Sequence, residues 1–130
     1  MKIKIGDKAI ATRVFDEESG RFFAKLTGDY NPVHFDAAYA SNTIFKKPIV
    51  HGPFVITLIT TLFATDIPGP GSVYLSHTVN YLHPVYYGDK ITASVEVIDI
   101  NEKNHVFLKT VCLNQDGDLI LDGVARLKVF

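Results

Sequence analysis

The sequence is poor in cysteine, in net charge and in long apolar runs. Its single cysteine, Cys112, cannot form an intrachain disulfide bond, so a reducing compartment fits best. Because its neighbours are mostly apolar, we expect Cys112 to be a buried side chain and not a reactive thiol. The 13 Lys and Arg nearly balance the 14 Asp and Glu, which gives a formal net charge of −1. That balance provides no electrostatic footprint for nucleic acid or for an anionic membrane.

No segment has the pattern of a signal peptide or of a membrane span. The N-terminal residues lack a long apolar core. The longest apolar stretch, from Ile49 to Ala64, is interrupted by His51, Gly52 and Pro53 and by threonines, so it is too short and too polar to cross a bilayer. We therefore expect a cytoplasmic protein. Its 130 residues, 47% hydrophobic and 21% charged, have the length and composition of a single globular domain spanning residues 1–130.

The first 41 residues predict one strand and two helices. Residues 8–15 have the composition of a strand, and Asp16 is a suitable N-cap for the helix that follows. Residues 29–35 should be irregular, because Pro32 has no backbone N–H and blocks a helix there. Residues 36–41 predict a further short helix.

A longer apolar helix is predicted from Gly52 to Ala64, with Pro53 in its first turn. Its apolar residues recur at positions i, i+3, i+4, i+7 and i+8, which is helical spacing. They are Phe54, Val55, Leu58, Ile59, Leu62 and Phe63. Because β-branched residues are numerous, tertiary burial must hold this helix more than intrinsic propensity does.

The second half predicts four strands, at residues 72–82, 90–100, 105–113 and 118–130. Gln115-Asp116-Gly117 is a strong hairpin signal between the last two. Read as consecutive hairpins, the strands predict an antiparallel sheet. The fold class is therefore α+β, and the arrangement is that of a hot-dog fold, a curled antiparallel β-sheet wrapped around a long central α-helix.

Asp29 and His34 are the first candidates for catalysis. They lie five residues apart in a loop made rigid by Pro32, so both side chains can converge on one point, such as a water molecule. An ionised Asp can accept a proton from water, and a His can orient the water or transfer a proton. The spacing alone also allows a structural role in which Asp29 braces the loop.

His51 and Gly52 stand at the start of the apolar helix. A helix N-terminus presents unpaired N–H groups and the positive end of the helix dipole. Gly52 has no side chain, so a ligand carbonyl could approach its N–H and receive stabilisation as an oxyanion. The alternative is that Gly52 serves only the turn and His51 is a hydrogen-bonded structural histidine.

Taken together, these motifs strongly resemble the MaoC-like family of (R)-specific enoyl-CoA hydratases. The resemblance rests on Asp-x-Asn-Pro-x-His at residues 29–34, followed by Pro-Ile-Val-His-Gly at residues 48–52. Residues 68–75 and 84–89 look like the same family's strand start and turn. The resemblance covers nearly the whole chain, and the motifs occur in the family's order and spacing.

The resemblance implies a hot-dog homodimer whose sheets join, acting on a trans-2-enoyl thioester of coenzyme A, with no metal or redox cofactor. Asp29 and His34 match the family's catalytic pair, and Gly52 matches the residue whose N–H forms the oxyanion hole. Asn31 matches the Asn of the motif, and Thr60 falls where the family often carries a small hydroxyl residue facing the site.

The helix from Gly52 to Ala64 should line the acyl pocket. The residues predicted to bind substrate are Asn31, His51, Phe54, Thr60 and Phe63. Phe54, Ile59 and Phe63 are bulky, so we expect a preference for short acyl chains. The other histidines, His77, His83 and His105, lack metal-ligand spacing and are interpreted as structural or surface residues.

Three alternatives remain open at this stage. A hot-dog thioesterase would also place a carboxylate near the helix N-terminus. A 3-hydroxyacyl dehydratase acting on an acyl-carrier protein would share the reacting thioester. A non-catalytic acyl-thioester binding module would keep the fold without the chemistry, although the intact Asp29 and His34 argue against it.

Overall fold

The computed structural model describes residues 2–130 and contains the expected elements in the expected order. The bounds are β1 (Lys8–Val14), α1 (Glu17–Thr27), the 3₁₀ turn η1 (Pro32–His34), α2 (Ala37–Ser41), α3 (Gly52–Thr65), β2 (Val73–Tyr81), β3 (Lys90–Ile100), β4 (His105–Leu113) and β5 (Leu119–Lys128). The one local difference is η1. Proline is tolerated in the first turn of a helix, and Pro32 begins this turn within the segment predicted to be irregular.

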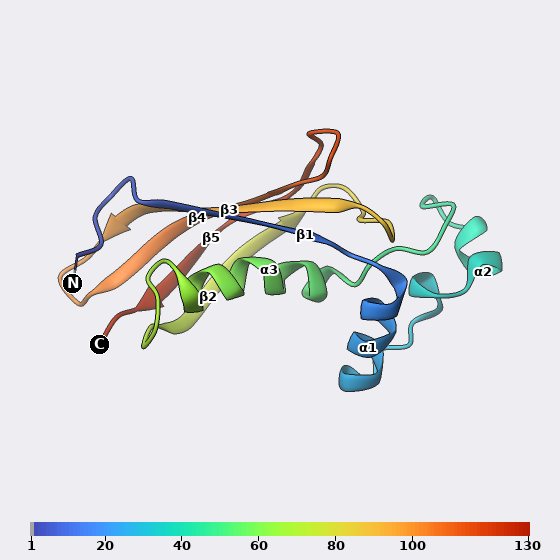
Figure 1. Ribbon diagram of the computed structural model, residues 1–130, viewed down its shortest axis with the longest axis horizontal. Coiled ribbons are helices and arrows are strands. Elements are labelled where there is room, and N and C mark those ends of the chain that lie inside the picture. Colours follow the sequence, from blue (N-terminus) through green and yellow to red (C-terminus); the bar gives the residue numbers. More distant parts are fainter. Residues whose placement is uncertain (1) are drawn as a thin grey trace.

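The strands form one antiparallel sheet in the order β1-β3-β4-β5-β2 (Figure 1). Strands β3, β4 and β5 are consecutive hairpins, as predicted. The expectation that β2 and β3 also form a hairpin is wrong, because β2 pairs with β5 instead. The physical reason is that β1 and β4 occupy both edges of β3, so no edge of β3 is left for β2.

Helix α3 lies across one face of this sheet, and the core forms between them (Figure 1). The buried face of α3 is the apolar set predicted from its spacing: Val55, Leu58, Ile59, Leu62 and Phe63. The strands meet it with alternate residues; on β3 these are Ile91, Ala93, Val95 and Val97, each at most 1% exposed. This arrangement is the predicted hot-dog fold.

Helix α1 and the segment after it extend beyond the end of α3 that begins at Gly52 (Figure 1). Asp16 caps α1 by accepting a hydrogen bond from the Ser19 amide at 2.8 Å. Gly28 ends the helix in the left-handed region, with φ at 84°, where glycine has no side chain to clash. The chain then turns back, and residues 29–34 reach the start of α3.

Two expectations from composition can be compared with this fold. Cys112 is fully buried, and burial raises the pKa of its thiol to about 12, so it is an unreactive core residue as predicted. Within residues 2–130, none of the helices combines the length and apolar character that a membrane crossing requires.

Candidate active site

Asp29 and His34 converge as predicted. The carboxylate atom Oδ2 of Asp29 lies 3.9 Å from the imidazole atom Nε2 of His34. His34 is buried, with 8% of its surface exposed, whereas the Asp29 side chain is 44% exposed. The pair therefore joins a buried imidazole to a carboxylate that solvent or a ligand can reach.

The local sequence explains how the carboxylate is aimed. Oδ1 of Asp29 accepts a hydrogen bond from the Asn31 amide at 3.2 Å. The Asn31 side chain in turn accepts one from the Val33 amide at 3.3 Å and caps the turn η1. Asn31 thus supports the geometry of the loop through its backbone and side chain. Its assignment as a substrate-binding residue stays a prediction.

His34 is held by a backbone group from a distant part of the chain. Its Nδ1 lies 2.9 Å from the carbonyl oxygen of Ile49. A carbonyl can only accept a hydrogen bond, so Nδ1 carries the hydrogen and Nε2 keeps a free lone pair toward Asp29. Burial lowers the pKa of His34, and the nearby His51 lowers it further. The Ile49 carbonyl and Asp29 act in the opposite direction without reversing the shift.

His51 lies directly behind this pair. It is completely buried, and its Nε2 lies 3.0 Å from the backbone carbonyl oxygen of Asp29. Its ring stacks on the His34 ring, with centroids 3.8 Å apart and planes inclined by 26°. His51 therefore contacts both members of the pair. Its imidazole is packed inside the protein and does not face solvent.

Gly52 begins α3 immediately after His51. The carbonyl of His51 accepts the amide hydrogens of Phe54 and Val55, whereas the amide of Gly52, in the first turn, has no partner inside the helix. A Cβ atom at position 52 would lie 2.9 Å from the Tyr81 ring. Gly52 thus combines a helix-terminal N–H that has no partner inside the helix with a close approach to the Tyr81 ring.

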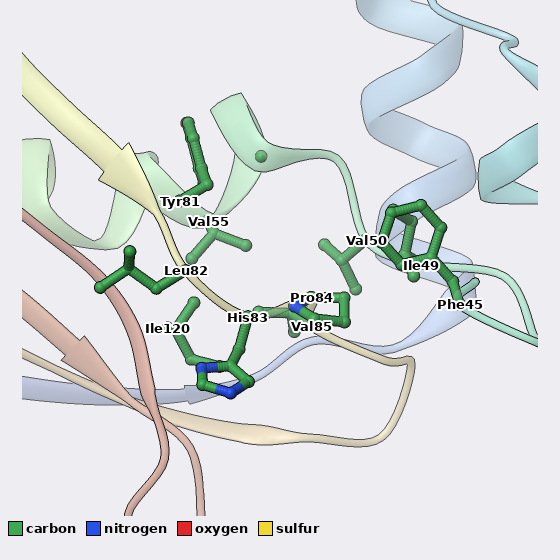
Figure 2. A pocket seen from close by; sticks show the side chains of 11 residues that line it. Phe45, Ile49, Val50, Val55, Tyr81, Leu82, His83, Pro84, Val85 and Ile120 are labelled. Atoms are coloured by element: carbon green, nitrogen blue, oxygen red, sulfur yellow. The ribbon is translucent and has the colours of Figure 1, made fainter.

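A cavity of about 290 Å³ lies beside Gly52. Figure 2 shows apolar side chains from the end of β2, from α3 and from the loop before α3 around it, among them Tyr81, Val55 and Phe45. Gly52 lines this cavity, whereas Asp29 and His34 do not. Gly52 therefore lies between the cavity and the Asp29–His34 pair. Tyr81 was not among the predicted site residues. The only feature of the sequence that pointed to it was Gly52, because a glycine lets another side chain approach the backbone closely.

The chain is similar to known proteins over nearly its whole length. The family model described as MaoC like domain matches residues 3–117. This chain belongs to the MaoC-like family. An (R)-specific enoyl-CoA hydratase of Aeromonas caviae is 37% identical over 128 residues, which are 98% of this chain and 96% of that protein. A mitochondrial 3-hydroxyacyl-acyl-carrier-protein dehydratase of Solanum lycopersicum is 36% identical over 95% of this chain and 75% of that protein.

Solved structures agree with the fold. An (R)-hydratase from A. caviae superposes with a TM-score of 0.94 at 37% identity, covering 99% of this chain and 98% of that chain. An (R)-hydratase of Pseudomonas aeruginosa superposes with a TM-score of 0.90 at 40% identity, covering 98% and 83%. The predicted family and hot-dog fold are confirmed, and this MaoC-like protein is a hydro-lyase.

Three predicted substrate residues of this MaoC-like chain lie away from the pair. Phe54 stacks on Phe23 with ring centroids 4.9 Å apart, under α1. Phe63 is 2% exposed and packs in the core near the far end of α3. The Thr60 hydroxyl, two turns from Gly52, donates to the Thr57 carbonyl at 3.2 Å. None of them lines the cavity beside Gly52, so their roles in substrate binding stay predictions.

The donor set at this MaoC-like site does not suit a metal ion. Asp29, His34 and His51 offer possible ligand atoms within 4.8 Å of one another. One nitrogen of each imidazole is committed to a backbone carbonyl, at Ile49 and Asp29 respectively. The remaining lone pairs lie in ring planes that are stacked 3.8 Å apart, whereas a metal requires them to converge on one point. These residues do not form a metal site in this geometry.

Proposed function

We propose that this protein is an (R)-specific enoyl-CoA hydratase, which reversibly adds water to a trans-2-enoyl-CoA to give an (R)-3-hydroxyacyl-CoA. The observation that carries the proposal is the facing pair of acceptors, Oδ2 of Asp29 and Nε2 of His34. Homology supports the substrate class, since (R)-specific enoyl-CoA hydratases of Aeromonas caviae and Rhodospirillum rubrum are 37% and 34% identical to this chain.

The geometry of the pair suits one water molecule. A carboxylate oxygen and an unprotonated imidazole nitrogen both accept hydrogen bonds, and 3.9 Å is too long for a direct bond between them. A water molecule between Asp29 and His34 could donate one hydrogen to each, as bridging waters commonly do. Its lone pairs would then point away from both residues and toward the substrate.

The proposed reaction uses this orientation. Asp29 withdraws a proton as the water oxygen attacks C3 of the enoyl group, and negative charge moves to the thioester oxygen. The Gly52 N–H and the positive end of the α3 dipole stabilise that oxygen. A proton returns to C2, so one water molecule is added in total and no group is lost.

An acyl-carrier-protein dehydratase is the strongest second candidate, because the relative in Solanum lycopersicum is named for that activity. The reacting thioester is the same, so the pair of Asp29 and His34 serves either carrier. Rates with crotonyl-CoA and with crotonyl-acyl-carrier protein, measured with the same enzyme preparation, would separate the two. We expect the higher kcat/KM with crotonyl-CoA.

The experiment that tests the proposed function is a product analysis. Crotonyl-CoA should lose its enoyl absorbance, and chiral chromatography of the hydrolysed product should give (R)-3-hydroxybutyrate. Free thiol, measured in the same reaction, should stay at background. Thiol release at the rate of substrate loss would instead favour the thioesterase, and no reaction with either carrier would favour the binding module.

The acyl preference is proposed to be short. Ile59 and Phe63 fill the interior beneath α3, with 0% and 2% exposure. The apolar space nearest Gly52 is about 290 Å³, at the lower end of the range for small-molecule pockets. We place the acyl chain there, so that bulky side chains such as Phe45 limit its length.

The oligomer is proposed to be a homodimer joined through β2. This strand ends the sheet and pairs on one side only, with β5. Its unpaired edge carries half-exposed apolar side chains, namely Val73, Tyr74, Leu75 and Tyr81, and exposed strand edges readily pair with another chain. Light scattering should give twice the chain mass of 14.4 kDa. Leu75→Lys should shift the protein toward the monomer. A monomeric wild type would contradict this proposal.

A further inference from the structure

Among the residues that the structure describes, His51 is the side chain that contacts both members of the proposed catalytic pair. It reaches Asp29 by a hydrogen bond and His34 by ring stacking. Its Nε2 reaches the backbone of Asp29, 22 residues earlier in the chain. Its ring face covers His34. Nothing in the reaction proposed above uses His51 directly, so these two contacts require a separate account.

The contact with Asp29 anchors the backbone that carries a partly exposed carboxylate. The Asp29 side chain is 44% exposed, and the hydrogen bond that its carboxylate accepts from the Asn31 amide comes from the same short loop. The Asp29 backbone carbonyl, however, accepts a hydrogen bond at 3.0 Å from His51, whose side chain is fully buried. Because a carbonyl only accepts, Nε2 of His51 carries the hydrogen. This bond holds the backbone from which the carboxylate projects.

The contact with His34 completes the orientation of that ring. The Ile49 carbonyl fixes one edge of the His34 ring through Nδ1. The His51 ring, 3.8 Å away between centroids, covers one face. An edge bond and a stacked face together restrict rotation of the His34 imidazole, so its Nε2 stays directed at Asp29.

His51 is itself held by rigid surroundings. It is the residue before Gly52 in the first turn of α3, and its carbonyl accepts two amide hydrogens of that helix. Phe23 and Phe35 pack against its ring, with centroids 5.0 Å and 5.5 Å away. The start of α3, which also carries the Gly52 N–H, is thereby connected to both Asp29 and His34.

We propose that His51 is a positioning residue that sets the spacing between Asp29 and His34 and ties it to the oxyanion-binding end of α3. The proposal rests on the hydratase function proposed above. His51 touches neither water nor substrate in this account. It acts through one hydrogen bond to the backbone of Asp29 and one stacked face against His34.

Two substitutions separate these contacts. His51→Gln keeps an N–H donor at the position of Nε2 and removes the ring face, whereas His51→Phe keeps the face and removes the donor. Misplacement of catalytic groups by about 1 Å can cost roughly a hundredfold in rate. Each variant should therefore lower kcat for crotonyl-CoA hydration by about 10- to 100-fold, with KM changed by less than about threefold.

The matched control is His77→Gln. His77 is a half-buried histidine whose Nε2, like that of His51, hydrogen-bonds within the fold, at 2.8 Å from the Thr110 hydroxyl. It contacts neither Asp29 nor His34. It should keep the wild-type kcat. Thermal unfolding of all three variants shows whether each is folded at the assay temperature, and if one is not, the other His51 variant still decides.

Imidazole ¹⁵N spectra supply a readout that a merely structural role would not move. The wild-type His34 should show a hydrogen on Nδ1 and a free lone pair on Nε2, and in His51→Gln this single state should become a mixture. As a second readout, the losses caused by Asp29→Asn and His51→Phe should be less than additive, because both act on the same carboxylate.

The results also distinguish this inference from the function on which it rests. Suppose that the wild type hydrates crotonyl-CoA and that both His51 variants are folded, keep the wild-type kcat and show unchanged His34 signals. This result would overturn the inference and leave the proposed function standing. No hydration by the wild type, combined with altered His34 signals in His51→Gln, would overturn the function and leave the positioning role supported.

Discussion

The hydrogen bond between Nδ1 of His34 and the carbonyl oxygen of Ile49, at 2.9 Å, decides which nitrogen of this proposed catalytic histidine is free. It leaves Nε2 unprotonated toward Asp29, and the proposed reaction requires that state. Protonation of Nε2 would replace an acceptor for water with a donor aimed at the carboxylate. The hydration rate should therefore fall as His34 becomes protonated.

This relationship predicts the acid limb of the pH profile. Burial, reinforced by His51, lowers the pKa of His34 below the ordinary imidazole value of about 6.5. Neutral His34 is the active form, so activity should persist as pH falls through 6.5 and decline only at lower pH. The measurement is kcat/KM for crotonyl-CoA between roughly pH 4.5 and 8. An acid limb centred above 6.5 would contradict the lowered pKa of His34.

Gly52 should tolerate alanine in folding but not in catalysis. The added Cβ would lie 2.9 Å from a carbon of the Tyr81 ring, and Tyr81 is half exposed, so its side chain can move. Gly52→Ala should therefore leave thermal stability nearly unchanged and lower kcat by about tenfold or more, since one oxyanion donor is worth about 10²–10³ in rate when lost.

Tyr81 provides the control for that substitution. In Gly52→Ala/Tyr81→Ala the steric conflict is absent, yet the methyl group still stands beside the N–H. The double variant should remain as slow as Gly52→Ala. Recovery of the rate to that of Tyr81→Ala alone would locate the effect in the displaced tyrosine and not in access to the amide.

Gly20 should be required by the ring of Tyr87. A Cβ at position 20 would lie 2.7 Å from a carbon of that ring and 2.8 Å from the Tyr87 hydroxyl oxygen. Glycine to alanine inside a helix ordinarily stabilises by up to about 1 kcal/mol, whereas overpacking costs about 1–3 kcal/mol. Gly20→Ala should therefore lower the free energy of unfolding in urea. In a Tyr87→Leu background the same change should be neutral or stabilising, and a loss there too would exclude the Tyr87 contact as the cause.

The cavity beside Gly52 should set the acyl length. Phe45→Ala enlarges it at a partly buried position, so the ratio of kcat/KM for octenoyl-CoA to that for crotonyl-CoA should rise by about tenfold, within the range for added methylenes in an apolar pocket. Leu113→Ala, on β4 and outside the cavity, should leave the ratio unchanged. An unchanged ratio in Phe45→Ala would place the acyl chain elsewhere.

Local patterns in the sequence predict much of the fold. Alternation at Ile91, Ala93, Val95 and Val97 predicts one buried face of β3, because successive side chains on a strand point to opposite sides. The pairing of β2 with β5 could not be predicted this way. It depends on β1 occupying the free edge of β3, and single-strand patterns carry no information about which edges are taken.

The site divides in the same manner. The convergence of Asp29 and His34 and the place of Gly52 at the start of α3 could be predicted, because the chemistry of these residues is visible in the sequence. Their catalytic roles stay predictions. The Ile49 carbonyl that orients His34 could not be, since every residue has such a carbonyl. Helical spacing likewise places Phe63 on the apolar face of α3, but it does not distinguish a residue of the core from one that lines a ligand pocket.

The central claim is that Asp29 removes a proton from a water molecule held between it and His34. The direct test is the rate at which crotonyl-CoA loses its enoyl absorbance with wild type, Asp29→Asn and His34→Ala, compared at equal folded concentration. Asn keeps the size of Asp29 but cannot take the proton, so the activity of each variant should fall by at least about a hundredfold. A near-normal rate in Asp29→Asn would contradict the account.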